Sequence, residues 1–122
     1  MLNLDTHILL FAAAGDLSAK ERRLLVADPR WGISGIVLWE ISKLAALGRI
    51  SIDLDSPILK ELIRRLTVWP ITAEVARQST RLDIRSDPAD ELIVATSIVF
   101  NVSLVTRDKK LLRSKITPFP FR

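Results

Sequence analysis

The chain has 122 residues, of which 48% are hydrophobic and 26% charged, and this composition is ordinary for one soluble globular domain with its own core. It contains no cysteine and a single histidine, which excludes disulfides, thiolate chemistry and most histidine-based metal or acid–base sites and is compatible with a reducing cytoplasm. The formal net charge of +4 favours a polyanionic partner only weakly.

The first part of the chain predicts a strand and two helices. Leu2–Asp5 reads as a short strand, and Thr6–Ala14 is an apolar run compatible with a helix that stops at Gly15. This run is too short to cross a bilayer and no basic leader precedes it, so we expect neither a membrane span nor a signal peptide. The capping-box sequence Ser18–Glu21 then starts a second helix towards Ala27.

The middle of the chain predicts three further helices and two short strands. In order, we expect a loop at 28–32, a very short strand at Ile33, a helix from Ser34 to Leu47, an irregular stretch at 49–55, a helix starting at Ser56, a strand at Thr67–Ile71 and a helix from Thr72 to about Leu82. Pro57 suits the first position of its helix, whereas Pro70 indicates that its strand lies at a sheet edge or ends there.

The last part of the chain carries the clearest local signals. Asp87 is expected to cap a helix whose first position is Pro88, and Leu92–Phe100 is so apolar that this helix should be covered on most sides. Asn101 ends the helix and Val102–Val105 follows as a short buried strand. One helical turn at 109–113 and an extended tail at 116–121 complete the chain. Strands that alternate with helices predict a three-layer α/β/α fold with a central, mainly parallel sheet, formed by residues 1–122 as one domain.

Four acidic residues stand where this fold would bring them together. Asp5 ends the first strand, Asp90 lies in the first turn of the last long helix, and Asp108 follows the last strand, and ligands bind at that end of open parallel sheets. Glu40 interrupts the apolar face of its helix, where burying an unpaired carboxylate costs several kcal/mol. Structural explanations remain open: an ion pair with one of 18 Lys and Arg for the glutamate, and helix caps or dipole partners for the aspartates.

Several carboxylates that converge without histidine or cysteine suit a hard cation, Mg2+ or Mn2+. One or two such ions, ~4 Å apart if two, activate water and stabilise the leaving oxygen in the hydrolysis of phosphate esters. The water attacks the phosphorus in line, so no side chain need become covalently attached to the substrate.

Four segments, in this order and over essentially the whole chain, resemble the PIN-domain ribonucleases, and most closely the VapC toxins of prokaryotic toxin–antitoxin pairs. They are Leu4-Asp5-Thr6, Ser34-Gly35-Ile36 with Glu40, Asp87-Pro88-Ala89-Asp90 followed by Leu92–Thr96, and Leu104–Asp108. The resemblance implies a metal-dependent endoribonuclease whose catalytic, metal-binding cluster is Asp5, Glu40, Asp90 and Asp108, with Thr6 and Thr106 as supporting hydroxyls. It also implies a homodimer that is inhibited by a small antitoxin protein whose tail occupies the cleft.

The chain departs from many relatives beside the third segment, where Ile84-Arg85-Ser86 replaces a stretch with histidine and Ala89 replaces an aromatic residue. Arg107, Lys109 and Lys110 lie beside the proposed site and are candidates for contacts to RNA phosphates, although a solvated face explains them equally well.

Two other functions compete with this interpretation. A flavodoxin-like phosphoryl-transfer or signalling domain requires a nucleophilic Asp at the central strand and a paired Lys, for which we find no counterpart. A non-catalytic, basic RNA- or partner-binding module would use the same acids structurally.

Overall fold

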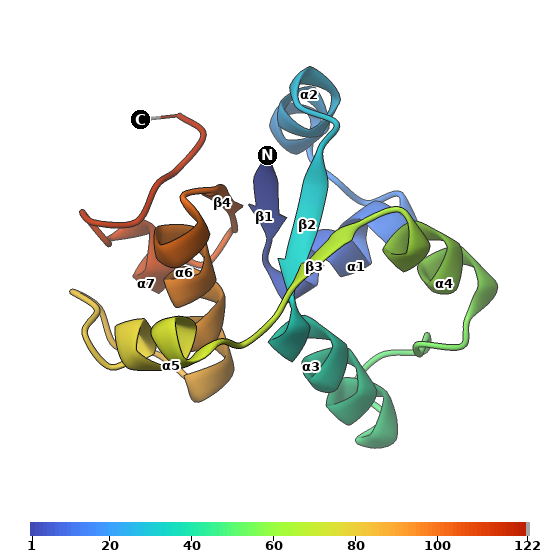
Figure 1. Cartoon of the computed structure of the whole chain (residues 1–122). Coiled ribbons are helices and arrows are strands. Elements are labelled where there is room, and N and C mark those ends of the chain that lie inside the picture. The colour runs from blue at the N-terminus through green and yellow to red at the C-terminus, as the bar shows by residue number, and fades with distance from the viewer. Residues whose placement is uncertain (122) are drawn as a thin grey trace.

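A four-stranded parallel sheet runs through the centre of the computed structural model, which describes residues 1–121 (Figure 1). Its strands are β1 (Leu2–Leu4), β2 (Trp31–Ser34), β3 (Thr67–Trp69) and β4 (Ser103–Val105). They lie in the order β3-β2-β1-β4 and every neighbouring pair is parallel. Leu4 pairs in register with Val105, so the residues that follow β1 and β4 emerge at the same edge of the sheet.

Helices cover both sides of this sheet, which confirms the expected three layers. The helices are α1 (Thr6–Ala14), α2 (Ala19–Ala27), α3 (Gly35–Ala46), α4 (Pro57–Arg64), α5 (Ala73–Ser79), α6 (Pro88–Phe100) and α7 (Lys109–Leu112). Helix α6 packs against β1, β2 and β4 with α5 beside it, and α1 with α4 lies on the other side (Figure 1). Within residues 1–121, no helix combines the length and the apolar character needed to cross a membrane.

Helix α6 is buried on most sides, as its apolar sequence predicts. The five consecutive residues 93–97 are all buried, and Asn101 ends the helix in the left-handed conformation with φ of 52°. The side-chain amide of Asn3 on β1 donates hydrogen bonds to the carbonyl of Ile93 at 3.0 Å and to Ser97 Oγ at 2.9 Å. These hydrogen bonds hold α6, which carries Asp90, beside β1, which Asp5 follows.

Strand β2 begins earlier than the sequence indicates. Trp31 and Gly32 belong to the strand, whereas we expected a loop up to residue 32 and a strand at Ile33 alone. The physical reason is a contact from a distant residue: a Cβ added at Gly32 would lie 2.5 Å from the ring of Trp69. Glycine is therefore needed here for the close approach of β3, not for a turn.

Helix α5 ends at Ser79 instead of about Leu82. The segment beyond it is bound to the C-terminal part of the chain, because the carboxylate of Asp83 accepts hydrogen bonds from Ser114 Oγ and from the Lys115 backbone, both at 2.6 Å. These tertiary contacts compete with further helical turns and are invisible in the local sequence.

The C-terminal tail covers the outer edge of the sheet. The backbone N–H of Leu104 on β4 donates to the carbonyl of Pro118 at 2.9 Å, and Phe119 is buried against the core. An edge strand with unpaired backbone groups invites association with other chains, and this tail satisfies one such group.

Candidate active site

A cleft of about 450 Å³ contains all four predicted acids in its lining. Asp5 follows β1 directly, Asp108 lies beyond the end of β4, Asp90 occupies the first turn of α6, and Glu40 projects from α3. The other lining residues are His7, Phe11, Asp87, Arg107 and Lys110. The structure thus brings together four carboxylates from four separate parts of the chain.

Threonine hydroxyls contact two of these carboxylates. The hydroxyl of Thr6 donates a hydrogen bond to Glu40 Oε1, and the hydroxyl of Thr106 donates to Asp5 Oδ2 at 2.6 Å. Asp5 Oδ1 also accepts the backbone N–H of Thr6 at 2.8 Å. Both threonines that the resemblance singled out therefore touch acids of the cleft directly.

The third hydroxyl contact was not anticipated from the sequence. Ser86 Oγ donates to Asp90 Oδ2 at 2.8 Å, and Asp108 Oδ1 accepts the backbone N–H of Lys110 at 2.8 Å. The spacing of Ser86 four residues before Asp90 is compatible with this contact but does not predict it. Glu91, which we left outside the site, accepts the backbone N–H of Ser86 at 3.3 Å instead.

Within residues 1–121, none of the four acids forms an ion pair with lysine or arginine. The alternative explanation of Glu40 as a structural ion pair is therefore wrong for the described chain. The capping explanation is partly right, because Asp5 and Asp108 also accept N-cap hydrogen bonds of α1 and α7. Asp87 occupies the N-cap position of α6 without a side-chain cap bond.

The environment of the cleft disfavours negative charge on two of its aspartates. Burial raises the pKa of Asp5 to about 6, the nearby charge of Asp90 adds to this, and the hydrogen bond from Thr106 opposes it. Burial likewise raises the pKa of Asp90, with contributions from the charges of Asp108 and Asp87. The carboxylates repel one another, and the raised pKa values of Asp5 and Asp90 describe a setting in which a cation would bind favourably.

The donor set matches a hard divalent cation, since carboxylate oxygens are the ligands such ions prefer. Nevertheless, among residues 1–121 no group of three or more acidic or histidine side chains is close enough together to hold an ion as it stands. The cleft provides suitable donors, and hydroxyl and backbone groups donate hydrogen bonds to its carboxylates.

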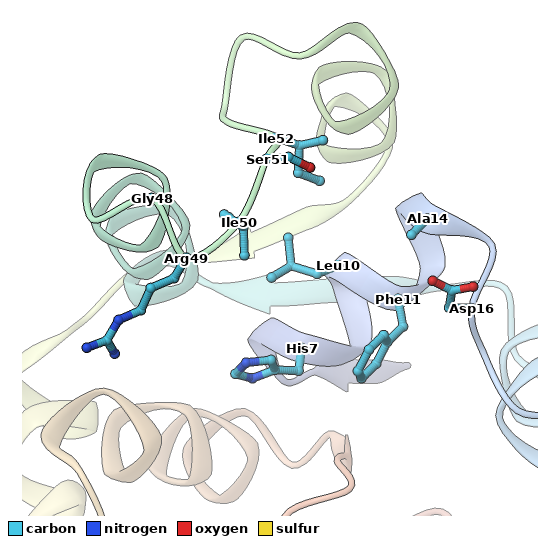
Figure 2. Close-up of a pocket in the computed structure, with 10 residues that line it drawn as sticks. All are labelled: His7, Leu10, Phe11, Ala14, Asp16, Gly48, Arg49, Ile50, Ser51 and Ile52. Carbon is cyan, nitrogen blue, oxygen red and sulfur yellow. The ribbon is translucent and has the colours of Figure 1, made fainter.

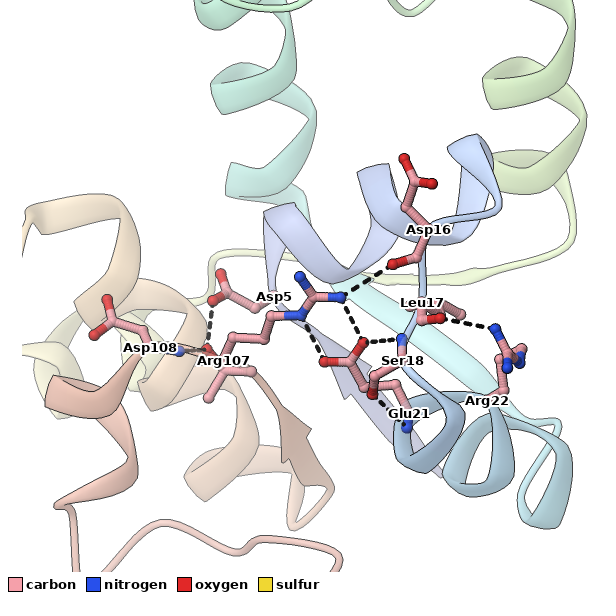
Figure 3. Close-up of polar contacts among 9 residues, drawn as sticks. Asp5, Asp16, Leu17, Ser18, Glu21, Arg22, Arg107 and Asp108 are labelled. Carbon is pink, nitrogen blue, oxygen red and sulfur yellow. Dashed lines mark hydrogen bonds and ion pairs between the residues drawn. The ribbon is translucent and has the colours of Figure 1, made fainter.

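The three basic residues proposed for RNA contact are in different situations. Lys110 lines the cleft and is exposed, whereas Lys109 is exposed but does not line it. Arg107 lines the cleft, yet its guanidinium is bound to Glu21 (Figure 3). His7 is exposed and also lines the cleft.

A larger groove of about 590 Å³ adjoins the cleft and shares His7 and Phe11 with it (Figure 2). The walls of the groove come from α1 and from the segment 48–52, and its apolar members are Leu10, Phe11, Ala14, Ile50 and Ile52. None of the four acids lines it. Sequence reasoning missed this groove because segment 48–52 has no regular pattern.

The family model of the PIN domain matches residues 3–115. The chain belongs to the PIN-domain family. This confirms the resemblance that the four sequence segments indicated. No curated protein sequence matches the chain.

Several solved structures share this PIN-domain fold. VapBC2 from Rickettsia felis, bound to a DNA fragment from its promoter, matches with a TM-score of 0.74 and 22% identity over 98% of this chain and 97% of that chain. A toxin–antitoxin complex from Klebsiella pneumoniae gives 0.72 and 21%, over 93% and 91%. FitAcB from Neisseria gonorrhoeae gives 0.69 and 19%, over 98% and 96%. At these identities the likeness establishes the fold.

Proposed function

We propose that residues 1–122 form one PIN-domain endoribonuclease whose catalytic residues Asp5, Glu40, Asp90 and Asp108 hold Mg2+ or Mn2+. The observation that carries this proposal is the convergence of four carboxylates in one cleft, where, within residues 1–121, no lysine or arginine forms an ion pair with them. The choice of RNA as substrate rests on the family resemblance.

A divalent cation in this cleft would activate water and neutralise charge on the phosphodiester. The chain's own residues orient and complement that chemistry. The hydroxyls of Thr6, Ser86 and Thr106 each hold one carboxylate by a hydrogen bond and so limit its rotation. Cation binding would favour the deprotonated forms of Asp5 and Asp90, whose pKa values burial raises. Lys110 at the lining offers a positive charge to the phosphate backbone.

The four acids must draw closer to share a cation, since no three of them enclose a common centre in residues 1–121. We infer that the side chains of Glu40 and Asp90 would reorient on binding, within the limits set by the hydroxyls that hold them. Both are partly exposed, whereas Asp5 is buried at 6% exposure and would serve as the fixed ligand.

We further infer that the protein is a toxin controlled by a small antitoxin protein in the cytoplasm, and that it forms a homodimer. The family resemblance supports this, as do solved toxin–antitoxin complexes with the same fold. The apolar groove beside the cleft offers a surface on which such a partner can dock while its tail occupies the cleft. Expression of the chain alone should arrest growth, and co-expression of the neighbouring gene product should restore it.

The decisive test of the nuclease is incubation of the partner-free protein with mixed RNAs, with Mg2+, with Mn2+ and with EDTA. Cleavage should require the metal and stop in EDTA. Asp90→Asn, purified identically, controls for contaminating nuclease, and Glu61→Gln is a control because Glu61 lies on α4 and does not line the cleft. RNA binding that survives EDTA without any cleavage product in Mg2+ would contradict the nuclease and support a binding module.

A further inference from the structure

Arg107 is anchored at the rim of the cleft by contacts to the N-terminal part of the chain. Its Nε and Nη2 atoms donate to the carboxylate of Glu21 at 2.6 Å and 2.7 Å, and Nη2 also donates to the carbonyl of Asp16 at 3.2 Å (Figure 3). The guanidinium lies 3.8 Å from the centroid of the Phe11 ring. A bidentate ion pair that is also stacked on an aromatic ring fixes both the position and the plane of an arginine.

The glutamate end of this pair is itself held rigidly. Glu21 is the third residue of α2, and its side chain accepts the backbone N–H of Ser18 at 2.8 Å while Ser18 Oγ accepts the N–H of Glu21. The side chain of Glu21 is 13% exposed, compared with 42% for Arg107. The capping box that the sequence predicts therefore doubles as the docking point for Arg107.

The segment that carries Arg107 also carries two groups of the cleft. Thr106 donates its hydroxyl to Asp5 at 2.6 Å and accepts the backbone N–H of Asp108 at 3.0 Å. Asp108 is itself one of the four acids. Any shift of segment 106–108 would consequently move two groups at once. One is the Thr106 hydroxyl, which holds Asp5, and the other is the carboxylate of Asp108.

We propose that Glu21 and Arg107 are positioning residues, whose ion pair sets segment 106–108 and through it Thr106 and Asp108. This inference rests on the proposed function, because it concerns the same acidic site. It gives Arg107 a role different from the RNA contact that its sequence position suggested. Neither residue touches the reacting atoms; they act through the geometry of their neighbours.

The test is a double-mutant cycle of Glu21→Gln, Arg107→Met and the combined variant, with Mn2+ affinity measured in the absence of RNA. Each single variant and the double variant should lose about the same factor in affinity, on the order of tenfold, because breaking either end releases the same segment. The kcat for RNA cleavage should fall by a similar factor while KM changes less than about twofold. Arg107→Lys keeps the charge but not the bidentate fork, and should restore affinity only in part.

A matched control is Glu61→Gln on α4, which also removes a glutamate paired with arginine and lies outside the cleft lining. It should leave Mn2+ affinity, kcat and KM unchanged. In metal-free protein, the amide NMR signals of residues 106–108 should shift in Glu21→Gln and stay in place in Glu61→Gln.

An RNA-contact role for Arg107 makes different predictions and would overturn the proposal. In that case Arg107→Met raises KM and weakens RNA binding in EDTA, while Glu21→Gln leaves Mn2+ affinity unchanged. Equal Mn2+ affinities in all variants would likewise overturn it. If the wild type binds Mn2+ but cuts no RNA, only the proposed nuclease function is contradicted. The Mn2+ affinities of the variants still decide whether Glu21 and Arg107 are positioning residues. A wild type that binds no Mn2+ would contradict both.

Discussion

Acidic residues at the surface and in the cleft have opposite kinds of partners. At the surface, Asp28 binds the N-terminal amine at 2.8 Å, and Glu61 binds Arg64 and Arg65. In the cleft, Asp5 and Asp90 accept hydrogen bonds from neutral hydroxyl and backbone groups. Within residues 1–121, no lysine or arginine forms an ion pair with Asp5, which is only 6% exposed.

The pKa values follow this difference in partners. The hydrogen bond from the N-terminal amine lowers the pKa of Asp28 to about 2, whereas burial raises the pKa of Asp5 to about 6. The cleft therefore keeps negative charge that is unfavourable in the metal-free protein. Such an arrangement stabilises the fold less than paired charges would, and it is characteristic of sites that bind or react.

The largest effect expected is on cleavage by Asp90→Asn. The variant keeps the shape of the side chain but removes a charged ligand, so we expect RNA cleavage to fall by at least ~100-fold. Its melting temperature in EDTA should stay the same or rise, because one repelling charge is gone. A structural role predicts the reverse, since neutralising a buried paired acid costs a few kcal/mol. Cleavage assays and thermal melting in EDTA separate the two.

The second effect is stabilisation by metal. At a Mg2+ concentration of 100 times its Kd, the wild type should gain about 2.7 kcal/mol in the free energy of unfolding by mass action. Glu40→Gln should gain much less, because it lacks one of the proposed ligands. Melting curves with EDTA and with excess Mg2+ provide the comparison. Equal shifts in wild type and variant would mean that the ion binds elsewhere.

The third effect is a pH dependence that originates at Asp5. Because burial raises the pKa of Asp5 to about 6, the folded state binds this proton more tightly than the unfolded state does. The free energy of unfolding of the metal-free wild type should therefore fall as the pH rises from about 4 to about 6. Asp5→Asn should be more stable than wild type by about 1–3 kcal/mol at pH 7, with no advantage below pH 4. Denaturant unfolding across this range, in EDTA, measures it.

The smallest effect expected is at the surface. Glu61→Gln on α4 removes an exposed partner of two arginines, so the melting temperature should drop slightly at low ionic strength and not at all in about 1 M salt. Together with Asp90→Asn, this variant contrasts the two regions: loss of a surface acid is unfavourable, whereas loss of a cleft acid is neutral or favourable. A rise in stability for Glu61→Gln at low salt would break the contrast.

Local signals predicted the elements of this fold where local chemistry determines them. Pro88 at the start of α6 and Asn101 at its end stand where the sequence places them, and both hydrogen bonds of the capping box at Ser18 form. The start of β2 and the end of α5 were predicted wrongly. In both cases the deciding contacts come from residues distant in sequence, Trp69 over Gly32 and the C-terminal segment at Asp83.

The candidate site likewise combines features that the sequence predicts with features that depend on contacts between distant segments. Topology predicted that acids following β1 and β4 would meet, and the interrupted apolar face of α3 indicated Glu40. The hydroxyl of Ser86 and the ion pair between Glu21 and Arg107 could not be predicted, because each depends on how side chains from separate segments fit together. The sequence thus identifies the charged donors, and the family resemblance adds Thr6 and Thr106, while the contacts of Ser86 and Glu21 require the structure.

The most direct measurement is anomalous diffraction from crystals grown with Mn2+. We predict an anomalous peak in the cleft, with carboxylate oxygens of Asp5, Glu40, Asp90 and Asp108 around it, at roughly 2.0–2.2 Å from the ion or through a bound water. Crystals of Asp90→Asn should show a weaker peak or none. A wild-type map without a peak among these residues, or with a lysine or arginine paired to them in its place, would contradict the claim that the acids form a metal site.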